Sequence, residues 1–81
     1  MERVREIPYG FVSTYGDIDP RAPRRVGFVL ATTREEVPWH RVVRSNGTVP
    51  MGEEQLRLLR REGVPLKGRR VDMSRARWSS A

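Results

Sequence analysis

The sequence predicts a mainly α-helical protein, a small winged helix-turn-helix-like domain with one short β-hairpin. Two short helical segments lie within residues 15–31, with a proline-containing turn between them. Residues 53–62 carry acids in the first turn and arginines in the last, and Gly63 follows, which is typical of a capped helix. Asn46-Gly47 stands between β-branched residues, a pattern that predicts a tight turn and a two-stranded wing built from Val42-Val43 and the residues after the turn.

Length and composition exclude several classes of protein. With 81 residues, the chain has room for a single domain over residues 1–81 with one modest core. It contains no cysteine and one histidine, so disulfides, thiol nucleophiles and zinc–thiolate sites are excluded, and we expect no enzyme activity, no metal and no cofactor. No apolar run approaches the roughly 20 residues of a membrane span, and the N-terminus does not resemble a signal peptide. We therefore expect no membrane partner and a cytoplasmic location.

The charge of the chain favours a polyanionic partner. Sixteen Lys and Arg residues against ten Asp and Glu residues give a net charge of +6, and Lys67 is the one lysine. Arginine forms forked contacts with phosphate and guanine, and nucleic acid is the commonest partner of small basic domains. Many small proteins share this excess, so composition alone leaves the partner open.

The first predicted helices are marked by their capping residues. A short helix is expected over residues 1–6, ended by the turn at residues 7–10. Thr14 and Asp17 resemble a capping box, so a helix should begin at Tyr15.

Pro23 suits the first position of the next helix, which places Val26 and Leu30 on one face. Arg24 and Arg25 then fall in its first turn, where each cation opposes the helix dipole at a cost of about 0.3–1 kcal/mol. Contact with phosphates would compensate for this placement; the alternative is that both arginines are simply solvated.

The sequence of the last part of the chain contains no clear signal for a helix or a strand. Residues 69–78 are expected to be extended, and residues 65–81 to form a tail that packs back on the domain through Val71, Met73 and Trp78.

Five segments occur in one characteristic order and together resemble the DNA-binding domain of O6-alkylguanine-DNA alkyltransferases over residues 4–64. They are Ile7-Pro8-Tyr9-Gly10, Thr14-Tyr15-Gly16-Asp17, Arg24-Arg25-Val26-Gly27, Pro38-Trp39-His40-Arg41-Val42-Val43 and Leu58-Leu59-Arg60-Arg61-Glu62-Gly63-Val64.

The residue at position 39 sets the branch of this family that the chain resembles. In the family, a Pro-Cys-His-Arg motif carries the cysteine that accepts the alkyl group, and Trp39 stands at that place here. The alkyltransferase-like branch has this tryptophan and binds O6-alkylguanine without repairing it. An indole has no lone pair able to attack an alkyl carbon, unlike a thiolate, but its flat face can stack on a base.

The resemblance implies roles for individual residues in DNA binding. Tyr15 would press on the phosphate backbone and help to rotate the target nucleotide outward. Arg24 would enter the base stack through the minor groove and fill the space of the flipped base, and Arg25 takes this role if the register shifts by one. Arg41 would contact the DNA backbone or brace its own loop.

The same resemblance implies a lesion pocket lined by Trp39, with Leu30, Val42 and Tyr15 in its apolar wall. His40 and Glu62 match a pair that helps to polarise the thiol in active relatives. Because no thiol is present, we expect them to form a structural hydrogen-bonded pair.

The implied function is recognition of O6-alkylguanine in double-stranded DNA by minor-groove docking and nucleotide flipping. The protein would act as a monomer, transfer no alkyl group, and hand the lesion to nucleotide excision repair proteins. A winged helix-turn-helix regulator that reads an undamaged sequence in the major groove is an alternative. A protein-interaction module with an acidic partner is another.

Overall fold

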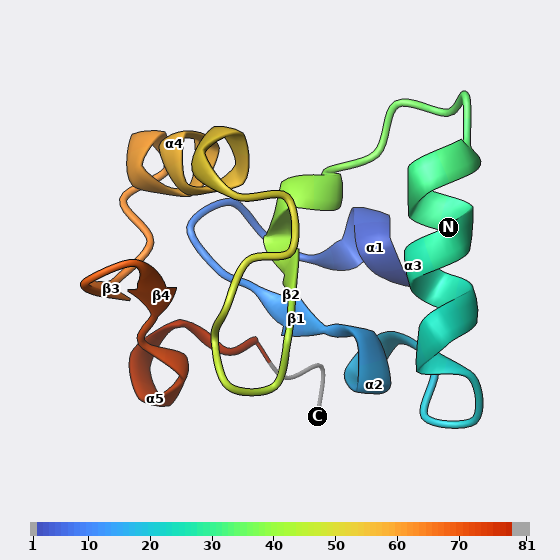
Figure 1. The fold of residues 1–81 in the computed structure, drawn as a ribbon, viewed down its shortest axis with the longest axis horizontal. Helices are drawn as coiled ribbons and strands as arrows, with labels where there is room; N and C mark the ends of the chain where they lie inside the picture. The colour runs from blue at the N-terminus through green and yellow to red at the C-terminus, as the bar shows by residue number, and fades with distance from the viewer. Residues whose placement is uncertain (1, 79–81) are drawn as a thin grey trace.

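The computed structural model describes residues 2–78, and the mainly helical fold with a small β-hairpin is confirmed. Figure 1 shows α3 along one side of the molecule, β1 and β2 in the middle, and α4, β3, β4 and α5 on the opposite side. Within the described residues, no helix is both long and apolar enough to cross a bilayer. In chain order the elements are α1 (Glu2–Glu6), β1 (Ser13–Thr14), α2 (Tyr15–Ile18), α3 (Pro23–Thr32), the 3-10 helix η1 (Trp39–Arg41), β2 (Val42–Val43), α4 (Glu53–Arg61), β3 (Leu66–Lys67), β4 (Arg70–Val71) and α5 (Met73–Ala76).

The short helix α2 is held by contacts at both ends. The Thr14 hydroxyl oxygen accepts a hydrogen bond from the Asp17 backbone N–H at 3.0 Å, which confirms the predicted cap. The Arg3 guanidinium donates to the Ile18 carbonyl at 3.1 Å, which satisfies a group at the C-terminal end. Arg77 forms a two-pronged ion pair with the Asp17 carboxylate at 2.6 and 2.9 Å. Four residues would not hold a helix alone, so these distant contacts stabilise α2.

The strand pairing differs from the predicted wing. The turn at Asn46-Gly47 forms, because Gly47 has a φ of 86° and the Arg44 N–H donates to the Thr48 carbonyl. However, the residues after the turn form no strand, and β2 instead pairs in parallel with β1, with Ser13 opposite Val42. The prediction of a hairpin built on Val42-Val43 is therefore wrong. The local turn signal was correct, but it carries no information about which strand pairs with β2.

The antiparallel hairpin lies in the C-terminal segment, where β3 and β4 pair with Leu66 opposite Val71. The extended conformation expected over residues 69–78 is also wrong, because α5 interrupts it. After α5 the chain returns to the residue before β1, Val12, which accepts from the Trp78 N–H at 2.8 Å and donates to the Ala76 carbonyl at 3.0 Å. Residues 79–81, the end of the expected tail, lie outside the described residues.

The core consists of two apolar clusters on either side of β2. Successive strand residues point to opposite faces, so Val42 enters one cluster and Val43 the other. The α1 side holds Val4, Ile7 and Val42, with Tyr15, Leu30 and Trp78 packed against them. The other cluster joins α4 to the C-terminal segment and contains Val12, Val43, Leu59, Val64, Val71 and Ala76.

Gly47 is the position where the turn and the C-terminal hairpin meet most closely. A Cβ atom there would lie 2.3 Å from the Val71 carbonyl oxygen, and the backbone has a left-handed φ. Gly47→Ala should therefore destabilise the protein by about 2–4 kcal/mol, measured by urea unfolding followed by circular dichroism. Gly63 is the control: its φ is 76° but nothing lies within 4 Å of the added Cβ, so Gly63→Ala should cost only about 1 kcal/mol. Equal losses in the two variants would contradict the close packing at Gly47.

Candidate nucleic-acid interface

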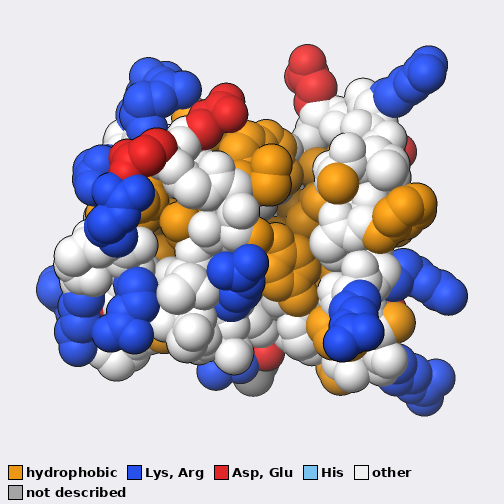
Figure 2. All heavy atoms as spheres, viewed as in Figure 1, with side chains coloured by type: hydrophobic (Ala, Val, Ile, Leu, Met, Phe, Trp, Pro, Cys, Tyr) orange, Lys and Arg blue, Asp and Glu red, His pale blue; other side chains and the backbone are white. Residues whose placement is uncertain are grey.

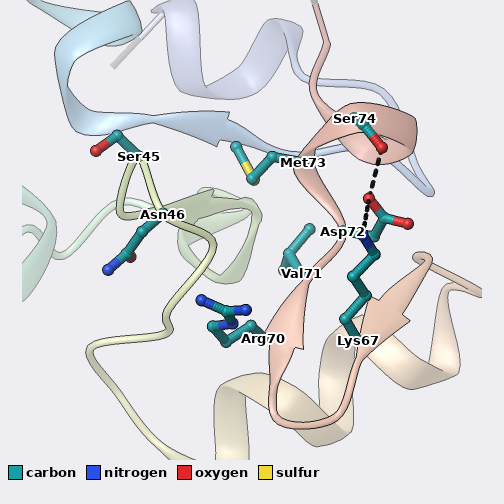
Figure 3. A pocket seen from close by; sticks show the side chains of 8 residues that line it. All are labelled: Ser45, Asn46, Lys67, Arg70, Val71, Asp72, Met73 and Ser74. Carbon is teal, nitrogen blue, oxygen red and sulfur yellow. Dashed lines mark hydrogen bonds and ion pairs between the residues drawn. The ribbon is translucent and has the colours of Figure 1, made fainter.

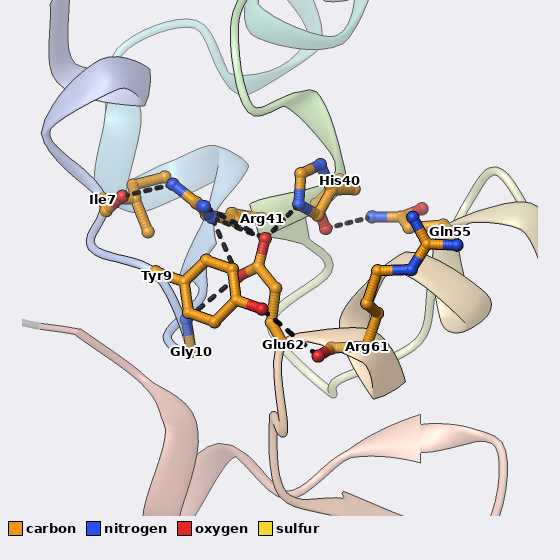
Figure 4. A network of polar contacts seen from close by, with 8 residues as sticks. All are labelled: Ile7, Tyr9, Gly10, His40, Arg41, Gln55, Arg61 and Glu62. Carbon is orange, nitrogen blue, oxygen red and sulfur yellow. Dashed lines mark hydrogen bonds and ion pairs between the residues drawn. The ribbon is translucent and has the colours of Figure 1, made fainter.

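A network of polar contacts around Glu62 holds η1 in place (Figure 4). The Glu62 carboxylate lies at the end of α4, and one of its oxygens is 2.5 Å from His40 Nε2. Its other oxygen accepts from the Gly10 backbone N–H at 2.9 Å. One side chain thus joins α4 to η1 and to the turn at residues 7–10. The structure brings together His40 and Glu62, which the resemblance had paired.

The Glu62 carboxylate is charged in this environment. Burial alone would raise its pKa, but hydrogen bonds from Arg41, the Gly10 N–H and His40 outweigh burial and hold the pKa of Glu62 below its usual value. Only 6% of the side chain is exposed, so the surrounding donors, rather than water, compensate the charge.

Arg41 belongs to this network. Its guanidinium donates to both Glu62 oxygens at 3.0 to 3.1 Å and to the Ile7 carbonyl at 3.0 Å. It also lies over the Tyr9 ring, 5.5 Å from the ring centre. With 16% of the side chain exposed and its donors turned inward, this geometry favours the bracing role over the predicted contact of Arg41 with DNA.

Trp39 begins η1 and is only partly buried. Its ring meets the His40 ring edge to face, with the ring centres 5.9 Å apart, and it belongs to neither apolar cluster. Behind it, the buried Gln55 amide donates to the carbonyls of His40 and Val42 at 3.0 and 2.9 Å. Trp39 therefore extends from a braced segment and keeps part of its surface exposed.

Tyr15 begins α2 and faces α3. A Cβ added to Gly27 would lie 3.7 Å from Tyr15 Cε1, so the tyrosine ring packs against this part of α3. Arg24 precedes Gly27 by three positions and lies on the same helix face. By helix spacing, Arg24 therefore falls on the side of α3 that carries Gly27, whereas Arg25 falls on a different side.

The Tyr15 hydroxyl is a neutral donor at this surface. Burial raises the pKa of Tyr15, and the positive charge of Arg44 offsets this only in part. Arg24 and Arg25 are both exposed, and among the described residues neither has an acidic partner within ion-pair distance. These groups are therefore available to bind an anion.

The predicted pocket residues occupy different depths. Tyr15 and Leu30 are partly buried and pack on the same cluster, so both retain exposed surface. Val42 is fully buried in that cluster, which means that its side chain supports the wall from behind and does not line it. Figure 2 shows hydrophobic side chains gathered in a hollow between α3 and the middle of the molecule, with Lys and Arg side chains around it.

Sequence reasoning missed two of the residues that shape this site. Gln55 is a polar residue on the apolar side of α4, four positions before Leu59, and this exception to the pattern was a signal for a buried brace. The positive charge of Arg44 opposes the rise in the pKa of Tyr15, although the two residues are far apart in the sequence, and no local sequence pattern singles out Arg44.

The fold and this surface define a small basic helix-turn-helix-like domain that binds DNA. Residues 1–64 match the family model of the 6-O-methylguanine DNA methyltransferase DNA-binding domain, and the chain belongs to this family.

Two relatives and one solved structure show which members the chain is similar to. A DNA base-flipping protein of Escherichia coli is 42% identical over 94% of this chain and 68% of its own length. Alkyltransferase-like protein 1 of Schizosaccharomyces pombe is 47% identical over 59% of this chain and 51% of its own length. The crystal structure of S. pombe Atl1 with damaged DNA containing O6-carboxymethylguanine superposes with a TM-score of 0.81 at 31% identity, covering 96% of this chain and 89% of that one.

Proposed function

We propose that this protein recognises O6-alkylguanine in duplex DNA by docking α3 in the minor groove and rotating the modified nucleotide into the hollow between α3 and the middle of the molecule, where it would meet Trp39. The observation that carries the proposal is Trp39 itself, which stands in place of the reactive cysteine, partly exposed on a braced 3-10 helix. The similarity to a base-flipping protein and to Atl1 supports the same role.

Nucleotide rotation needs a group that pushes on the backbone and a group that fills the vacated stack. Tyr15 supplies a rigid aromatic ring with a neutral hydroxyl that can donate to a phosphate oxygen. Arg24 extends from the first turn of α3 on the same helix face as Gly27, where an added Cβ would lie 3.7 Å from Tyr15 Cε1. Its planar cation can stack between bases, which offsets the few kcal/mol that base extrusion costs.

The hollow would accept the extruded base through flat and apolar contacts. Trp39 can stack on the purine, while Tyr15 and Leu30 present hydrocarbon surface. Apolar walls discriminate weakly between small and larger alkyl groups, so we expect tolerance for several O6 substituents.

The proposal includes no chemical step on the lesion. The chain has no cysteine, and indole cannot displace the alkyl group from guanine. A bound lesion must therefore be removed by other proteins, and we propose that the complex, formed by a monomer in the cytoplasm, marks it for nucleotide excision repair.

A binding titration tests this function. A duplex with one O6-methylguanine should bind tighter than the same duplex with guanine, because the altered base pair is easier to open and the hollow accepts the methyl group. Fluorescence anisotropy at physiological salt measures both constants, and a duplex with a labelled methyl group should leave no label on the protein. Equal affinities would refute lesion recognition, and label on the protein would refute the non-catalytic role.

A further inference from the structure

A second hollow lies between the turn at Asn46-Gly47 and the β3–β4 hairpin (Figure 3). Its volume is about 230 Å³. Figure 3 shows Ser45 and Asn46 on the turn, with the Arg70 side chain extending from β4 beside them. The polar residues that line the hollow are Ser45, Asn46, Lys67, Arg70, Asp72 and Ser74.

The two sides of this hollow are fixed to one another. The Val71 backbone N–H donates to the Gly47 carbonyl at 2.9 Å, and the Gly47 Cα approaches β4 too closely for any side chain. The Asp72 N–H donates to the Pro65 carbonyl at 2.9 Å, which closes the base of the hairpin. The two backbone segments that carry the lining residues are therefore held in position before any ligand arrives, and less backbone ordering is needed on binding.

The charges around the hollow favour an anion. Lys67 and Arg70 are exposed, and among the described residues Arg70 has no acidic partner. The one carboxylate, Asp72, is 10% exposed and accepts from the Ser74 hydroxyl at 2.7 Å. That hydrogen bond lowers the pKa of Asp72, so the carboxylate is charged, but it is turned toward Ser74 and lies 4.0 Å from Lys67.

Asn46 adds a neutral donor. Its side-chain oxygen accepts from the Thr48 backbone N–H at 3.1 Å and from the Thr48 hydroxyl at 2.7 Å. The amide nitrogen has no acceptor among the described residues, so it can donate to a ligand. Two cations, an amide and the Ser45 hydroxyl are the groups that bind phosphate oxygens in protein–DNA interfaces.

One side of the hollow, Ser45 and Asn46, follows directly after η1 and β2, the segment that begins with Trp39. Arg44 immediately precedes Ser45 in the chain, and its positive charge opposes the rise in the pKa of Tyr15 that burial causes. The longest dimension of the Cα trace is 28 Å. One turn of B-DNA is about 34 Å long, so a single helical turn is longer than the protein in any direction.

We propose that this hollow binds a backbone phosphate of the DNA that flanks the flipped nucleotide. The inference rests on the proposed function for the presence of DNA, but it concerns a separate contact that carries no information about the lesion. Residues 66–71 lie beyond the segment that matches the family model, so the C-terminal hairpin gives this chain a backbone contact additional to that domain.

The double variant Lys67→Ala/Arg70→Ala tests the contact through the salt dependence of binding. Loss of one phosphate contact should reduce the slope of log K against log salt by about 0.9 and weaken binding roughly tenfold at low salt. The affinities for damaged and undamaged duplexes should fall by the same factor, so the lesion preference is unchanged. Anisotropy titrations from 50 to about 200 mM salt measure both quantities.

Arg57→Ala/Arg60→Ala is the matched control. Both arginines are exposed on α4, their side chains have no hydrogen bond or ion pair among the described residues, and the net charge changes by the same amount. The control should keep the wild-type slope. An equal slope change in both double variants, or no change in either, would overturn the proposal.

Asn46→Asp provides an independent variant that preserves the turn. The aspartate oxygen can still accept from Thr48, but a negative charge replaces the amide donor inside the hollow. Binding to both duplexes should weaken at least as much as in the Lys67/Arg70 variant, and unchanged binding would contradict the phosphate site. If the slope falls as expected but wild-type protein shows no lesion preference, the phosphate contact stands and the lesion function fails.

Discussion

Replacing Glu62 with alanine is expected to destabilise the protein by about 3–5 kcal/mol, because it leaves the enclosed Arg41 cation without its anion. The variant also removes the acceptor of the Gly10 N–H and the partner of His40. A chain of this size has a total stability of about 4–12 kcal/mol, so much of the protein should be unfolded at 37 °C. Urea unfolding followed by tryptophan fluorescence and circular dichroism measures the loss.

Glu62→Gln separates the charge from the hydrogen bonds. Glutamine keeps one acceptor and a similar volume, so this variant should lose less stability than the alanine variant. Because the folded-state pKa of Glu62 is lowered, its stabilising contribution is complete above the unfolded-state pKa of about 4.3 and is lost as the pH falls through the folded-state pKa.

The wild-type protein should therefore lose stability over this acid range more steeply than Glu62→Gln. A residual dependence on pH will persist in the variant, because Asp17 and Asp72 also have lowered pKa values. Parallel curves for wild type and Glu62→Gln would show that Glu62 contributes nothing through its charge.

Elements with a local chemical signal could be predicted from the sequence. The Thr14 cap, Pro23 at the start of α3 and the left-handed Gly63 after α4 depend on residues within one turn of the chain, and all three are present. Strand pairing has no such signal. β2 pairs with a two-residue strand almost thirty positions earlier, and two residues are too few for a readable alternation of apolar and polar positions.

The candidate site shows the same division between local and distant information. The motifs select Trp39, His40 and Tyr15 from local sequence alone, but the orientation of Arg41 depends on Ile7 and Glu62, which are distant in sequence. The depth of Val42 follows from its pairing with β1, which was not foreseen. Prediction of a residue's role was therefore weakest where several separate segments determine its exposure.

Arg24→Ala is expected to abolish the preference for the damaged duplex while leaving the fold intact. Arg24 is exposed in the first turn of α3, where its charge opposes the helix dipole, so its removal should change stability by no more than about 0.5 kcal/mol. If its guanidinium fills the space that the extruded base leaves in the stack, the variant loses about 2 kcal/mol of stacking energy that offsets base extrusion. Binding to the O6-methylguanine duplex should then weaken roughly thirtyfold. Anisotropy titrations with both duplexes measure the change, and urea unfolding checks the fold.

Arg25→Ala is the control that decides between recognition of the lesion and binding of undamaged DNA by the helix-turn-helix surface. Arg25 is also exposed and carries the same charge, but by helix spacing it lies on a different face of α3 from Gly27, the position nearest Tyr15. Loss of the Arg25 side chain should weaken binding to the damaged and the undamaged duplex by the same factor, as expected for one backbone contact. If Arg24→Ala gave only this uniform weakening, Arg24 would be a phosphate ligand and not a stacking group. The helix-turn-helix surface would then hold undamaged DNA without inspecting its bases from the minor groove, and Trp39 would have no extruded purine to bind.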